Sequence, residues 1–410
     1  MGKPKIRFKG YEDDWEQRKL GEIYGSIGNA FVGTATPYYV EQGHFYLESN
    51  NVKDGQINHN SEIFINDEFY EKQKDKWLHT GDVVMVQSGH VGHAAVIPKE
   101  LNNTVAHALI MFRNPKEEIE PYFLNYEYQT DKVKKKIENI TTGNTIKHIL
   151  ASDMQEFVVD VPKYEEQKVI ASYFSHLDHL ITLHQRKCEE TKSLKKYMLQ
   201  KMFPENGKCV PEIRFSGFSD AWEQRKLEEY LGVSKEKNRE ESFGKDDVLS
   251  VSGEYGIVNQ IEFQGRSFAG ASVANYGVVE GGDVVYTKSP LKSNPYGIIK
   301  TNKGKTGIVS TLYAVYKPKN NVGAEFVQIY FELDSRMNSY MHPLVNKGAK
   351  NDMKVSDENA LKGSVIFPKI DEQKAISKYF AQLDHLITLH QHKCDELQKL
   401  KKFMLQNMFV

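Results

Sequence analysis

Hydrophobic positions recur every three to four residues along two long stretches of the chain, residues 162–203 and 368–409. This spacing places apolar side chains on one face of an α-helix, and its persistence over the whole stretch favours a coiled coil. Each stretch begins at a proline, contains no further proline or glycine, and has acidic residues in its first turn, which are helix-start signals. We therefore predict two helices of roughly 35 residues or more, each approaching ~60 Å in length.

The predicted seam of each helix contains apolar residues, a histidine and a cysteine, and Lys195 interrupts the pattern of the first helix. The seam residues are Ile170, Phe174, Leu177, Ile181, His184 and Cys188 in the first helix, and Ile376, Phe380, Leu383, Ile387, His390 and Cys394 in the second. Two equivalent helices in one chain can pair with each other. An antiparallel pair would form a spacer with one globular domain at each end.

The two stretches are also copies of one sequence, because 28 of their 42 positions are identical at an offset of 206 residues. A second repeat precedes them. Residues 3–20 reappear as residues 210–227, and both copies contain the run Trp-Glu-Gln-Arg-Lys-Leu. A self-similarity with a period of half the chain indicates two copies of one large unit.

The regions between these lead segments and the helices differ in sequence but follow one order of predicted elements. A Gly-Asp turn precedes an apolar run in each, and strand-like runs follow at 105–112 and 307–316. Amphipathic helices are predicted for 121–140 and about 324–341, then polar loops at 141–148 and 346–354, then a strand that ends in proline.

The predicted fold class is α+β, with two tandem mixed α/β domains, each followed by a long helix, and a pseudo-two-fold relation between the copies. The predicted domains are 1–161 and 206–367, and the helical regions are 162–205 and 368–410.

Composition adds few constraints. The chain has 410 residues, of which 27% are charged and 40% hydrophobic, which is typical of a globular protein. No apolar run reaches the ~18 residues of a membrane span, so no membrane association is expected. The three cysteines are widely spaced, which favours a reducing, cytoplasmic location over a disulfide framework.

The tandem units, the Trp-Glu-Gln-Arg-Lys-Leu run, the Pro-x-x-x-Glu-Gln-Lys helix start and the Met-Leu-Gln-x-Met-Phe helix end together resemble the specificity subunit of type I restriction–modification systems. The resemblance implies two target-recognition domains, each of which reads one half of a bipartite site in double-stranded DNA. It implies helical regions that form a spacer and dock two modification (methyltransferase) subunits. Motor/endonuclease subunits would join for restriction. The resemblance also implies that S-adenosylmethionine, ATP and Mg²⁺ are used by the partners and that this chain binds no cofactor.

The sequence offers only incomplete matches to catalytic motifs. Asn294-Pro295-Tyr296 is one proline short of an adenine-methyltransferase motif, and Gly304-Lys305-Thr306 lacks the leading glycine of a P-loop. Glu166-Gln167-Lys168 and its copy imitate the Glu-x-Lys of metal-dependent nucleases, but they lie in the first turns of a helix. His184 and Cys188 share a helix face, where a zinc site is an alternative to a polar layer that fixes register. We favour the polar layer and predict no metal site and no catalytic residue.

Loops after strands in the two variable regions contain the candidate DNA contacts, because Gln, Asn, Lys, Ser and Thr can read base edges and Lys also contacts phosphates. The candidates are Gln87, Ser88, His90, His93, Thr145, Lys147 and His148 in the first half, and Thr287, Lys288, Ser289, Lys292, Asn294, Lys347, Lys350 and Asn351 in the second. The alternative for each is a solvated loop residue. The run 132–136 (KVKKK) is either a phosphate-tracking face or the solvated side of a helix.

The net charge of −1 argues against DNA binding, because DNA-binding domains usually carry a basic excess. We expect weak, strongly salt-sensitive DNA binding by the isolated chain and tighter binding with its partners. Since the two variable regions differ, the target should be asymmetric. The alternatives are a coiled-coil adaptor that joins two protein-binding modules without reading DNA, and a single-chain enzyme.

Overall fold

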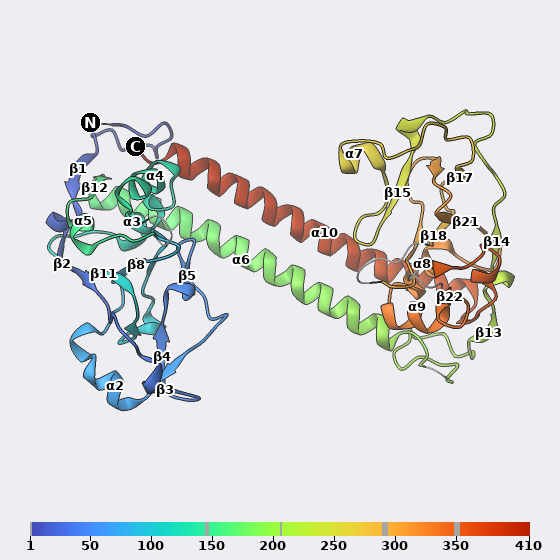
Figure 1. Ribbon diagram of the computed structural model, residues 1–410, viewed down its shortest axis with the longest axis horizontal. Coiled ribbons are helices and arrows are strands. Elements are labelled where there is room, and N and C mark those ends of the chain that lie inside the picture. Colours follow the sequence, from blue (N-terminus) through green and yellow to red (C-terminus); the bar gives the residue numbers. More distant parts are fainter. Residues whose placement is uncertain (1, 144–146, 206, 289–293, 348–352) are drawn as a thin grey trace. The chain divides into compact units, whose positions relative to one another are not determined.

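The computed structural model describes residues 2–143, 147–205, 207–288, 294–347 and 353–410 (Figure 1). The chain divides into two compact units. Unit 1 comprises Met1–Gln185 and His392–Val410, and unit 2 comprises Arg186–Gln391. Each unit therefore combines a globular part, the beginning of the long helix that follows it, and the end of the other long helix. Two 38-residue helices, α6 (Tyr164–Lys201) and α10 (Ile370–Asn407), supply these segments.

Unit 1 has an α+β globular part. Its strands are β1 (Glu16–Lys19), β2 (Tyr24–Asn29), β3 (Tyr39–Val40), β4 (His44–Leu47), β5 (Val52–Lys53), β6 (Gln56–Ile57), β7 (Phe64–Ile65), β8 (Val83–Val86), β9 (Ala94–Val96), β10 (Val105–Ala106), β11 (Leu109–Pro115) and β12 (Val158–Val161). Its short helices are α1 (Leu20–Ile23), α2 (Asp67–Lys72), α3 (Pro121–Glu127), α4 (Asp131–Ile140) and α5 (Ala151–Gln155).

Unit 2 has a similar order of elements. Its strands are β13 (Glu223–Lys226), β14 (Leu231–Val233), β15 (Leu249–Ser252), β16 (Gly256–Asn259), β17 (Gly277–Val279), β18 (Val284–Thr287), β19 (Ile299–Thr301), β20 (Gly307–Val309), β21 (Tyr313–Pro318), β22 (Asn346–Lys347), β23 (Met353–Lys354) and β24 (Ser364–Phe367). Its short helices are α7 (Gln260–Gln264), α8 (Ala324–Tyr330) and α9 (Asp334–Met341).

The central sheets of the two units share one topology. The strand order is β2-β11-β8-β9 in unit 1 and β14-β21-β18-β19 in unit 2, and all these pairs are antiparallel. The lead segment of each unit pairs with the strand that precedes the long helix, β1 with β12 and β13 with β24. This pairing fixes where each long helix begins, because β12 and β24 end just before Pro162 and Pro368.

Inside each unit α6 and α10 pack against each other in opposite directions. In unit 1 Phe174 of α6 faces Phe409, which follows α10, and Asp178 pairs with Lys401. Residue numbers therefore rise along α6 in the direction in which they fall along α10, so the two helices are antiparallel. Unit 2 repeats the arrangement with Phe380 against Phe203 and Asp384 against Lys195. The predicted long helices and their antiparallel pairing are confirmed.

Two details of the prediction were wrong. The single helix expected for 121–140 is two helices, because the Thr130 hydroxyl accepts from the Val133 backbone N–H at 3.3 Å and caps a new helix, α4. The region 324–341 likewise contains α8 and α9. The strand-like runs 105–112 and 307–316 each divide between two strands that belong to different sheets.

Within the parts of the chain that the structure describes, no helix is both long enough and apolar enough to span a membrane.

Candidate nucleic-acid interface

The repeated motifs at the start of each long helix hold the lead segment in place. The Arg7 guanidinium donates two hydrogen bonds to the Glu166 carboxylate, at 2.7 and 2.8 Å. Arg214 does the same to Glu372, at 2.7 Å for both bonds. Both glutamates are buried. A bidentate, buried pair of this kind commits the carboxylate to a structural contact, which argues against the nuclease alternative.

The glutamine of the same motif joins the start of each long helix to the residue before an earlier helix, α3 in unit 1 and α8 in unit 2. Gln167 accepts from the Glu120 backbone N–H at 2.9 Å and donates to the Pro162 carbonyl at 2.8 Å. Gln373 accepts from the Gly323 N–H at 3.0 Å and donates to the Pro368 carbonyl at 2.9 Å. The Glu-Gln pair therefore ties three segments of each unit together.

Between the helices, ionic contacts explain the lysine that interrupts the seam. Lys195 lies 2.6 Å from both Asp384 and Glu332. Burial opposes its charge, but the two carboxylates outweigh burial and raise the pKa of Lys195. In unit 1 Lys401 lies 2.7 Å from Asp178 and donates to the Gln129 side-chain amide oxygen at 3.1 Å. We call these contacts the Asp–Lys layers.

Most of the predicted seam residues are buried, and the others are half-buried. The buried residues are Ile170, Phe174, Leu177, Ile181, Cys188, Ile376, Phe380, Leu383 and Cys394, and the half-buried ones are His184, Ile387 and His390. The Cys188 thiol lies 3.9 Å from the Ile387 carbonyl oxygen. Among the described residues, no group of three or more His, Cys, Asp and Glu side chains could hold a metal ion.

In unit 1 the candidate DNA contacts lie together at the end of β8. The Gln87 carbonyl accepts from the Ile149 N–H at 3.0 Å, and Ser88 and His148 form an isolated antiparallel β-bridge. The Gly89 N–H donates to the Lys147 carbonyl at 3.1 Å, which closes the loop against the segment 147–149. The Gln87 side-chain oxygen is buried without a hydrogen-bond partner in the described part of the chain. Thr145 lies outside the described residues.

A cavity of about 310 Å³ opens beside this loop, and we call it the β8–α4 cavity. It is lined by Gly89, His90, Val91, Gly92, His93, Lys134, Ile137, Glu138, Thr141 and Lys147. Three candidates predicted from the sequence, His90, His93 and Lys147, thus come together. Lys134 was named only as part of the KVKKK run, and Thr141 and Glu138 were missed, because the approach of α4 to the β8–β9 loop leaves no local sequence pattern.

The candidates of unit 2 are less accessible where the structure describes them. Thr287 is buried, and its hydroxyl accepts from the Ile298 N–H at 2.8 Å, so its side chain does not face solvent. Lys288 pairs with Asp357 at 3.0 Å, and the Asn294 side-chain amide donates to Asp334. Ser289, Lys292, Lys350 and Asn351 lie outside the described residues, and Lys347 is described only as backbone of β22.

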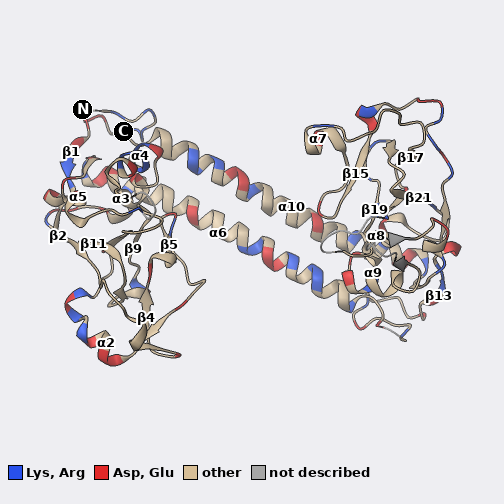
Figure 2. Cartoon of the chain, viewed as in Figure 1, with Lys and Arg blue, Asp and Glu red and all other residues tan. Residues whose placement is uncertain are grey.

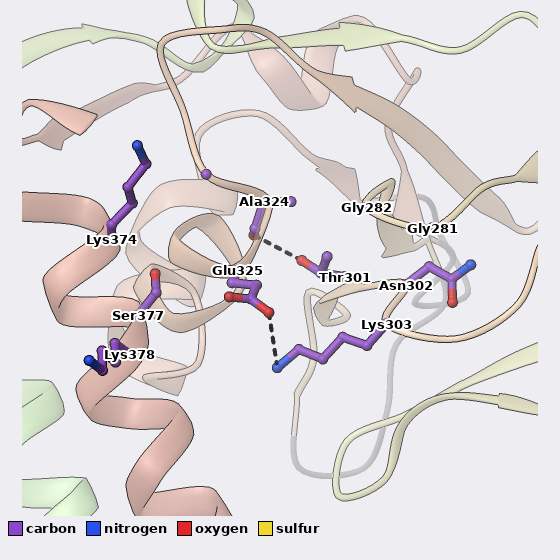
Figure 3. A pocket seen from close by; sticks show the side chains of 11 residues that line it. Gly281, Gly282, Thr301, Asn302, Lys303, Ala324, Glu325, Lys374, Ser377 and Lys378 are labelled. Atoms are coloured by element: carbon purple, nitrogen blue, oxygen red, sulfur yellow. Dashed lines mark hydrogen bonds and ion pairs between the residues drawn. The ribbon is translucent and has the colours of Figure 1, made fainter. Parts of the chain in front are cut away.

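A second hollow, of about 740 Å³, lies between the central sheet of unit 2 and the first turns of α10 (Figure 3). Lys303 approaches Glu325 to 3.9 Å, and the Thr301 hydroxyl donates to the Ala324 carbonyl at 2.8 Å. Lys374 and Lys378 line it from α10. Its surface is therefore basic, although the sequence did not indicate it.

Charges of both signs alternate along α6 and α10 (Figure 2). The exposed faces of these helices therefore lack the single-sign basic stripe of a phosphate-binding helix. Candidate basic surfaces lie instead in the globular parts and beside the first turns of α10.

Comparison with known proteins agrees with the arrangement of these motifs. Residues 12–193 match the type I restriction modification DNA specificity domain. The chain is 25% identical over 410 residues to the type I restriction enzyme MjaX specificity subunit of Methanocaldococcus jannaschii. The match covers 95% of this chain and 91% of that protein. It is 22% identical to the MjaVIII specificity subunit of the same organism, with the same coverage.

The fold also matches that of a solved structure, the S subunit of a type I restriction–modification system from M. genitalium. The TM-score is 0.63 at 15% identity, over 100% of this chain and 99% of that one. The repeated Arg–Glu and Glu-Gln contacts account for the sequence motifs on which the resemblance to specificity subunits rests. Over residues 12–193 the chain thus matches the DNA specificity domain of type I restriction–modification systems, and along nearly its whole length it is similar to specificity subunits of such systems.

Proposed function

We propose that unit 1 and unit 2 each read one half of an asymmetric, bipartite DNA site, and that α6 and α10 dock methyltransferase subunits. One observation carries the proposal. The framework contacts of the two units are the same, Arg7–Glu166 with Arg214–Glu372 and Asp178–Lys401 with Asp384–Lys195. The variable regions between each lead segment and its long helix have different side chains on this common framework. Two units with the same framework and different variable residues are expected of two modules that both recognise DNA but bind different sequences.

In this proposal the chain itself is not catalytic. Its nearest approach to a nuclease motif, Glu166 with Lys168, has its carboxylate bound to Arg7. Adenine methylation with S-adenosylmethionine, and cleavage driven by ATP with Mg²⁺ in motor/endonuclease subunits, belong to the partners.

Two exposed apolar pairs on the helices support docking of two copies of one partner. Leu194 and Tyr197 in unit 2 are 45% and 47% exposed, and their equivalents Leu400 and Phe403 in unit 1 are 41% and 56% exposed. Each pair is three residues apart on a helix, so its members are neighbours on one face. Contiguous exposed apolar surface commonly marks an interaction site. A surface present twice fits a partner present twice.

The test is to sequence methylated adenines in cells that produce this chain with its methyltransferase partner. We expect one bipartite, asymmetric motif that is lost when the chain is omitted. Gel shifts with randomised bipartite duplexes, with and without the partner, complement this. We expect weak, salt-sensitive binding alone and selective binding with the partner. Absence of any sequence selection in both experiments would favour the adaptor alternative, and methylation or cleavage by the purified chain alone would establish the single-chain enzyme.

A further inference from the structure

We infer that the β8–α4 cavity of unit 1 holds a phosphate group of the DNA backbone and does not read a base, with Lys134 as its main cationic contact. This inference rests on the proposed function, because it assumes that unit 1 contacts DNA. It assigns the loop 88–93 and one face of α4 to positioning the duplex, whereas base recognition belongs to other loops of the unit.

The shape of the cavity depends on two glycines in the β8–β9 loop. Gly89 and Gly92 have φ angles of +79° and +88°, in the region where residues with a Cβ are strained. A Cβ on Gly92 would also lie 2.9 Å from the Ile137 Cγ2 atom of α4. The loop therefore packs directly against α4. Glycine-containing loops of this kind let backbone approach a nucleic-acid backbone closely.

The charges that line the cavity favour an anion. Glu138 pairs with Lys147 at 2.9 Å, so these two groups neutralise each other. Lys134 then leaves an excess positive charge. Burial lowers the pKa of His93, the nearby Asp54 carboxylate opposes this shift and Lys134 adds to it, so the net direction favours the neutral ring near pH 7. The His93 Nδ1 atom accepts from the Asp54 N–H at 3.2 Å, which places the proton of the neutral ring on Nε2 as a donor.

The side chains best suited to base edges are missing from this lining. Paired donors and acceptors on Asn or Gln recognise adenine, and the planar fork of Arg recognises guanine with fixed geometry, whereas Lys contacts guanine or phosphate. Asn, Gln and Arg are not among the lining residues. The ammonium donor of Lys134 and the imidazole donor of His93 suit phosphate oxygens instead, whereas the Thr141 hydroxyl donates to the Ile137 carbonyl at 2.8 Å.

Contacts within unit 1 distinguish Lys134 from its neighbours in the KVKKK run. Lys132 donates to the Val410 carbonyl at 2.7 Å and to Asp160 at 3.3 Å, and Lys136 donates to the Val158 carbonyl at 3.4 Å. These two lysines hold the unit together. Lys134 lines the cavity, and Lys135, its exposed neighbour on the same helix, does not. The run is thus divided between structural and cavity-lining roles, and Lys135 provides a matched control.

The experiment compares Lys134→Ala with Lys135→Ala in the full-length chain together with its methyltransferase partner. Affinity is measured at several salt concentrations for a duplex with the target site and for a scrambled duplex. For Lys134→Ala we expect the same fold loss on both duplexes and a slope of log affinity against log salt that is less steep by about 0.9. Lys135→Ala should leave the salt slope unchanged. Lys134→Arg should retain most of the wild-type affinity and salt slope.

Two results would overturn the inference. Equal slopes for the Lys134→Ala and Lys135→Ala variants would exclude a phosphate contact at the cavity. A loss confined to the target duplex would show that the cavity reads a base. Failure of the proposed function is a separate outcome, since it requires that the wild-type complex shows no preference for the target. The slopes on the scrambled duplex still decide the role of the cavity in that case.

Discussion

Arg7 and Arg214 occupy equivalent positions in the two units. Arg7 pairs with Glu166 in the first turn of α6, and Arg214 pairs with Glu372 in the first turn of α10. The sequence repeat identified these residues as shared, but it could not show that they contact each other. Arg7 and Glu166 are 159 positions apart, and only the pairing of β1 with β12 brings them together. Repetition therefore predicted the importance of these side chains and not their role.

One buried carboxylate makes the stability of unit 1 depend on pH. Glu127 accepts from the Asp160 N–H at 3.1 Å, and its second oxygen has no hydrogen-bond partner among the described residues. Burial raises the pKa of Glu127 to about 8, and the Asp160 N–H opposes this rise. Between about pH 4.5 and pH 8 the folded state thus keeps a proton that the unfolded state loses. The free energy of unfolding therefore falls as pH rises through this window, by at most about 1.4 kcal/mol per pH unit.

Glu127→Gln should remove this dependence, because an amide cannot lose the proton. Relative to the wild type, we expect the variant to gain stability as pH rises from about 5 to about 8. Thermal unfolding of both proteins across this range measures the effect. Glu118→Gln, at an exposed position of unit 1, is the control, and its stability should change with pH in the same way as that of the wild type. Parallel curves for Glu127→Gln as well would show that Glu127 is ionised in the folded chain.

The long helices complete the core of each unit with residues from the opposite half of the sequence. Phe409 packs against Trp15, Phe123 and Phe174, with ring centroids 6.1, 5.3 and 5.8 Å away. Phe203 packs against Trp222 and Phe326 in unit 2, at 5.8 and 5.9 Å. The repeated Met-Phe at each helix end is therefore part of a core, which explains its persistence in both copies.

Phe409→Ala should weaken unit 1 and leave unit 2 unchanged, and Phe203→Ala should do the reverse. Truncation of a buried phenylalanine costs about 3–5 kcal/mol. Hydrogen exchange read separately over the two units provides the measurement. Phe403→Ala is the matched control, since this side chain is exposed, and it should lower binding of the methyltransferase partner with little loss of stability. Equal loss of protection in both units on Phe409→Ala would contradict this description of the cores.

The elements that sequence predicted best are those with long, regular patterns. The helices after Pro162 and Pro368 are present as α6 and α10. The helix expected over 121–140 divides at Thr130, where a hydroxyl cap and the packing of α3 decide against continuation. Thr287 was a candidate contact because it follows an apolar strand, but the pattern VVYT cannot show that all four residues are buried. The β8–α4 cavity joins residues 89–93 with residues 134–147, and such a contact is visible only after folding.

For the whole molecule, the separation of framework and loops predicts modular specificity. Exchanging residues 21–160 for the variable region of another specificity subunit should change one half of the methylated motif and retain the other. The framework contacts of unit 2, including Arg214–Glu372 and Lys195–Asp384, lie outside the exchanged segment. Sequencing of methylated adenines reads the result. A change in both half-sites would show that the two units do not read DNA independently.

The position of Phe409 in the core of unit 1 has a consequence for the order of events during synthesis. Unit 2 consists of residues 186–391, so all of it is synthesised before residues 392–410. Unit 1 needs residues 392–410 and must wait for the final helix turn to cover Trp15, Phe123 and Phe174. Domains usually fold in the order in which they are made, from the N-terminus onward. Here the half that is synthesised first is completed last, and the apolar surface that Phe409 covers stays open while the second half is synthesised.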